Sequence, residues 1–421
     1  SYRNNIILEV DSDDIIQLAQ LNEVKYIEKC LPETSFSDVA QRIINVDDLK
    51  DIDIGYDGSG EIIGICDTGI DTGDINTMHE DLRNRILLKP GTPSVPAIYS
   101  FSGGVPSDDS SGHGTHVAGC AVGDGTLSAS HTLGKVTGAA PGANLVFQSN
   151  KNYNMSYADL CFDLLDPVYN DGVRIHSNSW GWPANGAYTT KSEEIDEFIW
   201  YCKDMAVLYA VGNYGQNDTI AAPATAKNCI SVGASNSCNP LSGNTSFYGS
   251  ITSFSSRGYT DDGRIKPDIV APGNGVLATR STTDILGYLE EYNGNYTFKS
   301  GTSMSTPITA GAVAVMRQYM REELEHEPSA ALLKAALING ATDLGYDLPG
   351  KEQGWGQINL YDSLVSKEYK FVDGSKRFFG PGSVTYTYEI ESSDTPLKIT
   401  LAWTDYPASV LASKTLVDDL D

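Results

Sequence analysis

Short apolar runs bounded by glycine and aspartate recur through the central part of the chain. The runs are 62–66, 143–147, 173–176, 206–211 and 229–232. Helical patterns, such as 192–205 and 310–325, lie between them. Because near-continuous apolar strands alternate with helices, the pattern predicts an α/β fold with a parallel sheet covered on both faces. Ligands of such sheets bind at the carboxyl ends of the strands, so polar residues that follow a strand are the candidates for chemistry.

The N-terminal segment has a different pattern. Residues 5–10 and 24–28 alternate like strands, and residues 11–21 have helical spacing. A segment as short as 1–36 buries too little apolar surface to be stable alone. We therefore expect residues 1–36 to be an α+β segment that depends on a larger unit, 37–366.

The C-terminal segment changes to a β pattern. Residues 383–390 and 396–404 alternate with period two, and a turn-rich stretch separates them. Two strands do not make a stable domain by themselves. We interpret residues 367–421 as the truncated start of a β-sandwich domain.

Composition narrows the class of protein and its partners. Hydrophobic residues make up 40% and charged residues 20% of the chain, which is typical of a globular protein. The 55 acidic and 29 basic residues give a net charge of -26, so neither nucleic acid nor a membrane surface is expected as a partner. The seven cysteines lack the spacing of a zinc site.

Three short stretches contain an acid, a base and a hydroxyl that together could support nucleophilic catalysis. Asp67 ends an apolar run, where a carboxylate is costly unless it is paired, although it could simply cap the next turn. His113 lies between two glycines, so its ring can face a cleft. Ser303 precedes a small-residue run, 310–315, that suits a buried helix whose start favours negative charge. The alternative is an ordinary helix start, with Pro307 in the first turn.

The order of these three residues along the chain distinguishes families of serine hydrolases. Asp, His, Ser is the order of subtilisin, whereas chymotrypsin and the α/β-hydrolases have other orders. The stretches DTGID, GHGTHVAG and GTSMSTP, together with FSSRG (254–258) and RIKPDIVAPG (264–273), resemble the subtilisin-like serine peptidases, or subtilases. The resemblance implies a subtilisin-like parallel sheet flanked by helices and a serine endopeptidase activity.

The resemblance also implies a role for each residue. Ser303 would be the nucleophile, His113 the general base and then acid, and Asp67 the residue that orients the imidazole. Asn213 would donate its side-chain amide to the oxyanion, together with the N–H of Ser303. Without the three other residues, Gly212 and Asn213 would be interpreted as an ordinary turn.

A substrate pocket follows from the same resemblance. Ser179, Trp180 and Gly181 would line the pocket for the side chain before the scissile bond, and Ala210 would form the opposite wall. The substrate would add as a β-strand, with a hydrophobic preference in the pocket. For Trp180, packing in the core is the alternative.

Further expectations concern maturation, metals and partners. Residues 1–36 resemble the second half of a propeptide that acts as an intramolecular inhibitor, with a permanent N-terminal extension as the alternative. The chemistry needs no cofactor; structural calcium is common in the family, but the acidic stretch 71–74 has no diagnostic ligand spacing. The catalytic core followed by a β-domain, with QGWGQINL (353–360) before the junction, resembles the larger oxidatively stable alkaline subtilases of bacilli. We expect a secreted monomer that cleaves proteins or peptides.

Two other functions stay open at this stage. A non-catalytic binding protein on the same fold would be expected to lack one of Asp67, His113, Ser303 or Asn213, and all four are present. An esterase using the same site would hydrolyse esters and leave peptides almost untouched.

Overall fold

A computed structural model describes most of the central part of the chain. The described residues are 17–18, 20–21, 40–41, 43–50, 55–89, 91–92, 95–103, 107–130, 134–237, 249–284, 294–366, 370–374, 382–389 and 397–420. The chain divides into two units, 1–34 and 35–421. The strands predicted at 5–10 and 24–28 lie outside the described residues, so the propeptide-like segment stays a prediction.

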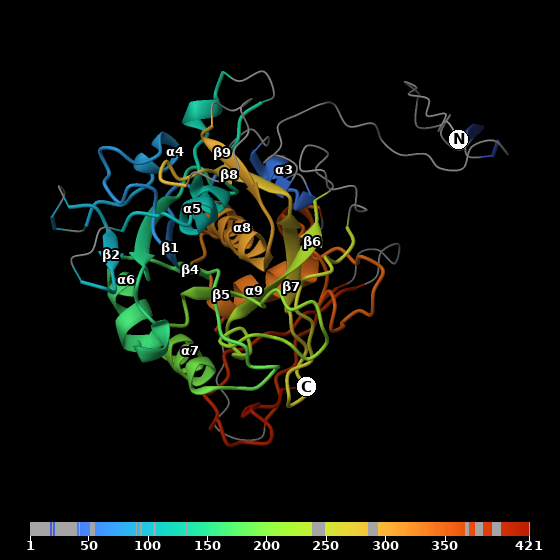
Figure 1. The fold of residues 1–421 in the computed structure, drawn as a ribbon. Coiled ribbons are helices and arrows are strands. Elements are labelled where there is room, and N and C mark those ends of the chain that lie inside the picture. The colour runs from blue at the N-terminus through green and yellow to red at the C-terminus, as the bar shows by residue number, and fades with distance from the viewer. Residues whose placement is uncertain are drawn as a thin grey trace, which may run out of the picture. The chain divides into compact units, whose positions relative to one another are not determined.

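A seven-stranded sheet forms the centre of the second unit (Figure 1). Its order is β2-β3-β1-β4-β5-β6-β7, and every neighbouring pair is parallel. The strands are β1 (Ile62–Asp67), β2 (Ile98–Ser100), β3 (Asn144–Ser149), β4 (Ile175–Asn178), β5 (Ala206–Ala210), β6 (Ile230–Asn236) and β7 (Ile269–Asn274). Two further strands, β8 (Val276–Thr279) and β9 (Tyr296–Lys299), follow β7 along the chain and form a separate antiparallel pair. The predicted parallel sheet is confirmed.

The helices cover this sheet. They are α3 (Asp47–Lys50), α4 (Glu80–Arg83), α5 (His113–Val122), α6 (Asp166–Asn170), α7 (Thr190–Tyr201), α8 (Thr302–Glu323), α9 (Ala330–Gly340) and α10 (Leu360–Leu364). Short turns of other helical types are η1 (Thr126–Ser128), η2 (Met155–Tyr157) and η3 (Leu160–Leu165). Among the described residues, no helix combines the length and the apolar character that crossing a bilayer demands.

Helix α8 lies in the middle of the molecule, with α5 beside it (Figure 1). It packs against β4, β5, β6 and β7, and every residue from Thr302 to Gln318 is buried. The small residues of this stretch allow the close packing: a Cβ added at Gly311 would lie 2.6 Å from the Cβ of Ala139. The sheet and the segment around Ala139 therefore enclose α8.

The C-terminal segment differs from its prediction. The described residues 382–389 and 397–404 form no strand, so the two strands expected at 383–390 and 396–404 are wrong for those positions. A strand needs a paired neighbour to satisfy its backbone, and period-two alternation alone does not supply one. The apolar residues of the alternating pattern stay uncovered by the described residues, as the side chain of Ile399 is 81% exposed. The assignment of 367–421 to a β-sandwich stays a prediction.

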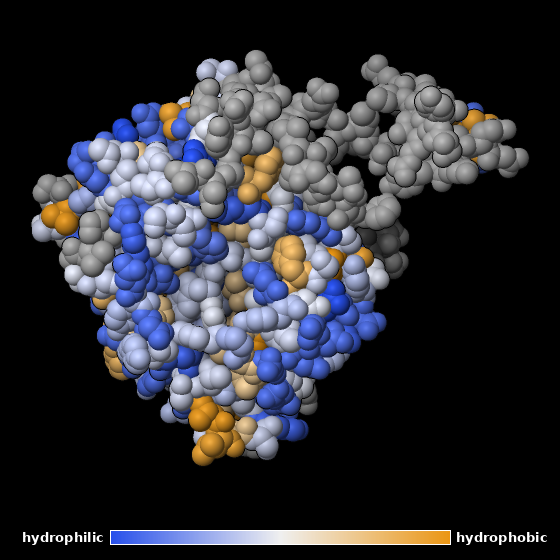
Figure 2. Space-filling view, viewed as in Figure 1, coloured by the Kyte–Doolittle hydropathy of each residue, from blue (hydrophilic) through white to orange (hydrophobic). Residues whose placement is uncertain are grey.

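Part of this segment nevertheless packs on the α/β unit. The buried ammonium of Lys227 pairs with Asp405 and donates to the carbonyl of Thr415. The side-chain NH2 of Asn228 donates to the carbonyl oxygen of Asp405, and its Oδ1 accepts the N–H of Asp405. Figure 2 shows hydrophobic residues at the lower edge of the molecule, where Figure 1 draws the end of the chain in red.

Candidate functional site

Three elements bring the predicted acid, base and nucleophile to one edge of the sheet. Asp67 is the last residue of β1, His113 is the first residue of α5, and Ser303 is the second residue of α8. The start of α5 approaches the end of β1 closely because residue 114 is glycine. A Cβ at Gly114 would lie 2.2 Å from the carbonyl oxygen of Gly69 and 3.1 Å from the Cβ of Asp67.

Asp67 and His113 form a hydrogen-bonded pair in which the carboxylate is buried and the imidazole is partly exposed. His113 Nδ1 lies 2.6 Å from Asp67 Oδ1, which also accepts the N–H of Thr68 at 2.8 Å. Asp67 is only 2% exposed, and its other carboxylate oxygen is buried without a hydrogen-bond partner among the described residues. The negative charge of Asp67 therefore favours the protonated form of His113.

The electrostatics of His113 follow from this pairing. Burial disfavours the charged imidazolium, but the negative charge and the hydrogen bond of Asp67 outweigh it, and Asp109 adds to their effect. The pKa of His113 is consequently raised above its ordinary value of about 6.5. An imidazole with a raised pKa is a stronger base, provided that the pH leaves it neutral.

Ser303 faces the same edge, although its hydroxyl is not bonded to His113 here. The hydroxyl donates to the carbonyl oxygen of Ser179 at 3.3 Å, and the described atoms of Ser303 and His113 share no hydrogen bond. Hydrogen bonds between catalytic groups are often long or misaligned without substrate. A rotation about the Cα–Cβ bond of Ser303 changes the direction of its hydroxyl and moves no backbone atom.

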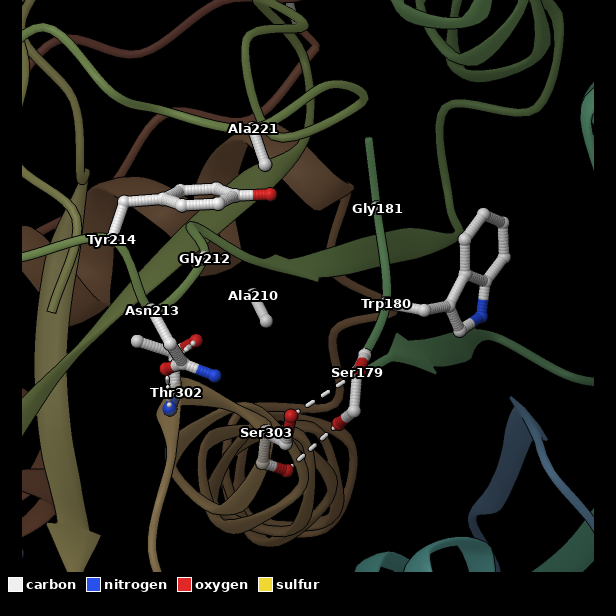
Figure 3. A pocket seen from close by; sticks show the side chains of 10 residues that line it. All are labelled: Ser179, Trp180, Gly181, Ala210, Gly212, Asn213, Tyr214, Ala221, Thr302 and Ser303. Atoms are coloured by element: carbon white, nitrogen blue, oxygen red, sulfur yellow. Dashed lines mark hydrogen bonds between the residues drawn. The ribbon is translucent and has the colours of Figure 1, made fainter. Parts of the chain in front are cut away.

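Ser179 and Ser303 exchange two hydrogen bonds (Figure 3). The second runs from the Ser179 hydroxyl to the carbonyl oxygen of Ser303 at 2.8 Å. In a regular helix this carbonyl would accept the N–H four residues later, but that residue is Pro307, which has none. Since α8 begins at Thr302, Pro307 lies inside the helix and beyond the predicted first turn. Ser179 replaces the bond that the proline removes.

This replacement predicts a coupled effect on stability. Ser179→Ala should lower the free energy of unfolding by about 1–3 kcal/mol, because the buried Ser303 carbonyl loses its donor. In a Pro307→Ala background the restored N–H can serve that carbonyl, so the same substitution should cost clearly less. Denaturant unfolding of the four variants, made with Ser303→Ala to prevent self-digestion, measures the difference. Equal costs in both backgrounds would contradict this explanation.

Asn213 lies across the start of α8. It follows β5, and its side-chain Oδ1 accepts the backbone N–H of Thr302 at 2.9 Å and the Thr302 hydroxyl at 3.0 Å. These two bonds fix the orientation of the amide. Its NH2 group makes no hydrogen bond within the described residues and points toward the space beside Ser303 (Figure 3). The N–H of Ser303 lies in the first turn of α8, where N–H groups have no acceptor within the helix.

A cavity of about 220 Å³ opens beside Ser303 (Figure 3). It is lined by Ser179, Trp180, Gly181, Ala210, Gly212, Asn213, Tyr214, Ala221, Thr302 and Ser303. All four predicted pocket residues are therefore among its lining, and no lining side chain is charged. Glycine is required at position 181, where a Cβ would lie 2.6 Å from the carbonyl oxygen of Ala222.

Trp180 contributes less to the cavity than predicted. Its indole points away from Ala210 and Asn213 (Figure 3) and donates its N–H to the carbonyl oxygen of Cys66 at 2.9 Å. It also packs edge-on against Tyr209, with ring centroids 5.6 Å apart. The partly buried indole therefore packs against the core, and Trp180 is also one of the residues that line the cavity.

Four lining residues, Gly212, Tyr214, Ala221 and Thr302, were not among the predicted site residues, and two of them show why. Tyr214 follows Asn213 directly and is 45% exposed, and its position next to a predicted oxyanion donor was a usable signal. Ala221 reaches the cavity because residue 222 pairs with Trp182 in an isolated β-bridge. Nothing local in the sequence indicates that long-range pairing.

The other histidine of GHGTHVAG has a structural role. His116 is completely buried, and its Nε2 lies 3.1 Å from the carbonyl oxygen of Val276 and 3.0 Å from that of Thr297. Burial lowers the pKa of His116 to about 3, so the ring is neutral. Within the described part of the chain, no group of three or more His, Cys, Asp and Glu side chains could hold a metal ion.

Asp71, the first residue of the acidic stretch 71–74, is not placed to bind a cation. Both carboxylate oxygens of Asp71 accept protein donors: one takes the N–H of Thr282 at 2.6 Å, and the other the N–H of His79 at 2.6 Å. These bonds leave Asp71 serving the loop itself. No calcium ligand is assigned.

Comparisons with known proteins agree on one family. The model of the Subtilase family (Peptidase_S8) matches residues 58–356. The serine protease/ABC transporter B family protein tagD of Dictyostelium discoideum is 27% identical over 88% of this chain, and the serine protease AprX of Bacillus subtilis is 31% identical over 73% of it. The chain spans 28% of the length of tagD and 66% of AprX. The CspB protease of Clostridium perfringens has the same fold, with a TM-score of 0.60 at 16% identity over 78% of this chain and 99% of that one.

Proposed function

Because the chain belongs to the subtilase family, we propose that it is a serine endopeptidase that works through an acyl-enzyme intermediate. The observation that carries this proposal is the 2.6 Å hydrogen bond between His113 and Asp67 at the sheet edge where Ser303 begins α8. A neutral serine hydroxyl is a weak nucleophile and needs such a base within reach. Asn213, beside the same helix start, supplies an NH2 group that makes no hydrogen bond within the described residues and can donate to an oxyanion.

The first half of the reaction forms the acyl-enzyme. Ser303 Oγ attacks the carbonyl carbon of the scissile peptide while His113 Nε2 takes its proton. Asp67 stays ionised and stabilises the imidazolium through the bond to Nδ1. The oxyanion that forms accepts the NH2 of Asn213 and the N–H of Ser303. His113 then returns the proton to the departing nitrogen, and the C–N bond breaks.

The second half releases the product. A water molecule gives a proton to His113 Nε2 and attacks the acyl carbon, and the same donors bind the second oxyanion. The proton then passes to Ser303 Oγ, and the ester bond breaks. Ser303 and His113 return to their starting states.

Substrate preference follows from the cavity. Its lining is uncharged, and Ala210 and Ala221 present methyl groups to the occupant. A charged side chain would lose water there without gaining a partner, so apolar side chains before the scissile bond are favoured. We propose protein and peptide substrates that bind as an added strand along the Ser179–Gly181 segment.

Hydrolysis of matched peptide and ester substrates tests this proposal. Peptide nitroanilides with Phe or Leu before the scissile bond should be cleaved about tenfold or more faster, in kcat/KM, than those with Lys or Glu. Ester turnover without peptide turnover would support the esterase instead. Binding of peptides without any turnover would support the non-catalytic alternative.

The oxyanion donor makes a separate prediction. Asn213→Leu removes the amide while keeping a side chain of similar size, and it should lower kcat by about 10²–10³ with little change in KM. This magnitude is the one known for the corresponding donor of subtilisin. Steady-state kinetics on the preferred nitroanilide measures it. A change confined to KM would show that Asn213 acts in substrate binding alone.

The remaining proposals concern the protein around this domain. We propose a secreted monomer whose residues 1–36 act as an inhibitory propeptide and are removed near residue 36. Sequencing the N-terminus of the purified active protein tests the removal. The chemistry above requires no metal, and structural calcium has no assigned ligand in the described residues.

A further inference from the structure

A second carboxylate lies behind the Asp67–His113 pair. Asp109 belongs to the loop before α5, and its side chain is completely buried. No lysine or arginine pairs with it within the described residues. A buried carboxylate without a cation is costly unless hydrogen bonds satisfy it, so the hydrogen-bond partners of Asp109 are what matters.

The hydrogen bonds of Asp109 connect it to the start of α5. Gly112, the residue that caps α5, has no side chain to offer the helix. Asp109 Oδ2 instead accepts the N–H of Thr115 at 2.8 Å and the Thr115 hydroxyl at 2.6 Å. A carboxylate at this position satisfies a first-turn N–H and stabilises the positive end of the helix. Asp109 thereby fixes the helix turn that carries His113.

The other oxygen connects Asp109 to the pair itself. The Thr68 hydroxyl lies 2.9 Å from Asp109 Oδ1 and 3.2 Å from Asp67 Oδ1, so both carboxylates share one donor. The Ser111 hydroxyl donates to Asp109 Oδ1 at 2.9 Å and accepts the backbone N–H of His113 at 3.2 Å. Asp109 therefore binds Thr68, which follows Asp67, and Ser111, which binds the backbone of His113.

We propose that Asp109 is a positioning residue for the hydrolytic reaction, which holds Asp67 through Thr68 and His113 through Ser111 and α5 and stabilises the imidazolium. The inference rests on the proposed peptidase activity. If the unaltered protein cleaves no peptide, the proposed function fails. If the unaltered protein cleaves peptides and Asp109→Asn cleaves them equally well, with the same pH dependence, only this inference fails.

The charges around His113 set the direction of the pH effect. Asp67 at the end of β1 and Asp109 in the loop favour the imidazolium, whereas Lys299 at the end of β9 opposes it. Lys299 is itself 3.7 Å from Asp284, which follows β8, and His116 one turn along α5 is neutral. Removing the Asp109 charge therefore lowers the pKa of His113.

The test compares Asp109→Asn with the unaltered full chain. Asn keeps the size of the side chain but removes its charge and one acceptor. Per active site, counted by titration with a fluorophosphonate, kcat for a peptide nitroanilide should fall about tenfold or more with little change in KM. The acid limb of the kcat/KM profile should move to lower pH, because His113 then stays neutral further down.

Two further variants separate positioning from folding. Asp108→Asn is the matched control, because this neighbouring carboxylate is partly exposed and paired with Lys151 at 2.6 Å; its kcat and acid limb should stay unchanged. Ser111→Ala removes an exposed hydroxyl and keeps the Asp109 charge, so kcat should fall about threefold without a shift of the acid limb.

The inference is overturned if Asp109→Asn retains the kcat and the acid limb of the unaltered protein, even where its free energy of unfolding falls. Should Asp109→Asn not fold, Ser111→Ala decides: an unchanged kcat in that variant overturns the inference as well.

Discussion

Replacing Ser303 by alanine is expected to lower kcat for a peptide substrate by about 10⁶, which is the loss known for the corresponding serine of subtilisin. The hydroxyl is the only group of this side chain that can form the acyl bond. The fold should survive, since its hydroxyl makes one hydrogen bond of 3.3 Å and the helix around it is closely packed. Burst and steady-state kinetics on a nitroanilide, with circular dichroism for the fold, measure both statements.

Ser305→Ala is the matched control for this prediction. Ser305 lies two residues further along α8, is completely buried, and donates its hydroxyl to the carbonyl oxygen of Ala271 in β7 at 2.9 Å. It is therefore directed at the sheet and away from the cavity lining. We expect Ser305→Ala to keep most of its activity. Comparable losses in the two variants would mean that packing of α8, and not the Ser303 hydroxyl, limits the reaction.

Replacing Asp67 by asparagine should have the second largest effect, a fall in kcat of about 10⁴. The amide has nearly the shape of the carboxylate, but it no longer stabilises the imidazolium or selects the ring tautomer that leaves Nε2 free to accept a proton. The 2.6 Å bond to Nδ1 is the contact that changes. Steady-state kinetics at the pH optimum of each protein measures the fall in kcat.

The same variant has a defined pH dependence. His113 must be neutral to act as a base, so kcat/KM falls as the pH drops through the pKa of His113. Asp67 raises that pKa, so the unaltered enzyme should lose activity already above the ordinary pKa of histidine. Residual activity of Asp67→Asn should persist to lower pH. An acid limb that stays in place would show that another group controls it.

The fold could be predicted because its signal is local. Buried parallel strands such as β1 and β5 are apolar on both faces, and this leaves continuous runs in the sequence. The strand β2 was missed because it has only three residues, all of them half-buried. The two strands predicted in the C-terminal segment are absent from its described residues. A period-two pattern predicts a strand but does not show which neighbour pairs with it.

The candidate site could be predicted only in part. The positions of Asp67, His113, Ser303 and Asn213 follow from strand ends and helix starts, which the sequence marks. The Ser179 hydroxyl bond was not predictable, because it depends on where α8 begins and on the carbonyl that Pro307 leaves without a partner. The indole direction of Trp180 likewise depends on the carbonyl of Cys66, far away in sequence.

Covalent labelling tests the central claim, that Ser303 is a nucleophile activated by His113, most directly. The protein is purified with its N-terminus sequenced, treated with a fluorophosphonate probe, digested, and analysed by mass spectrometry. The account predicts one phosphonyl group per molecule, on Ser303, formed in Ser305→Ala and absent in Ser303→Ala. Labelling of a different residue, or no labelling in folded protein from which residues 1–36 have been removed, would contradict it.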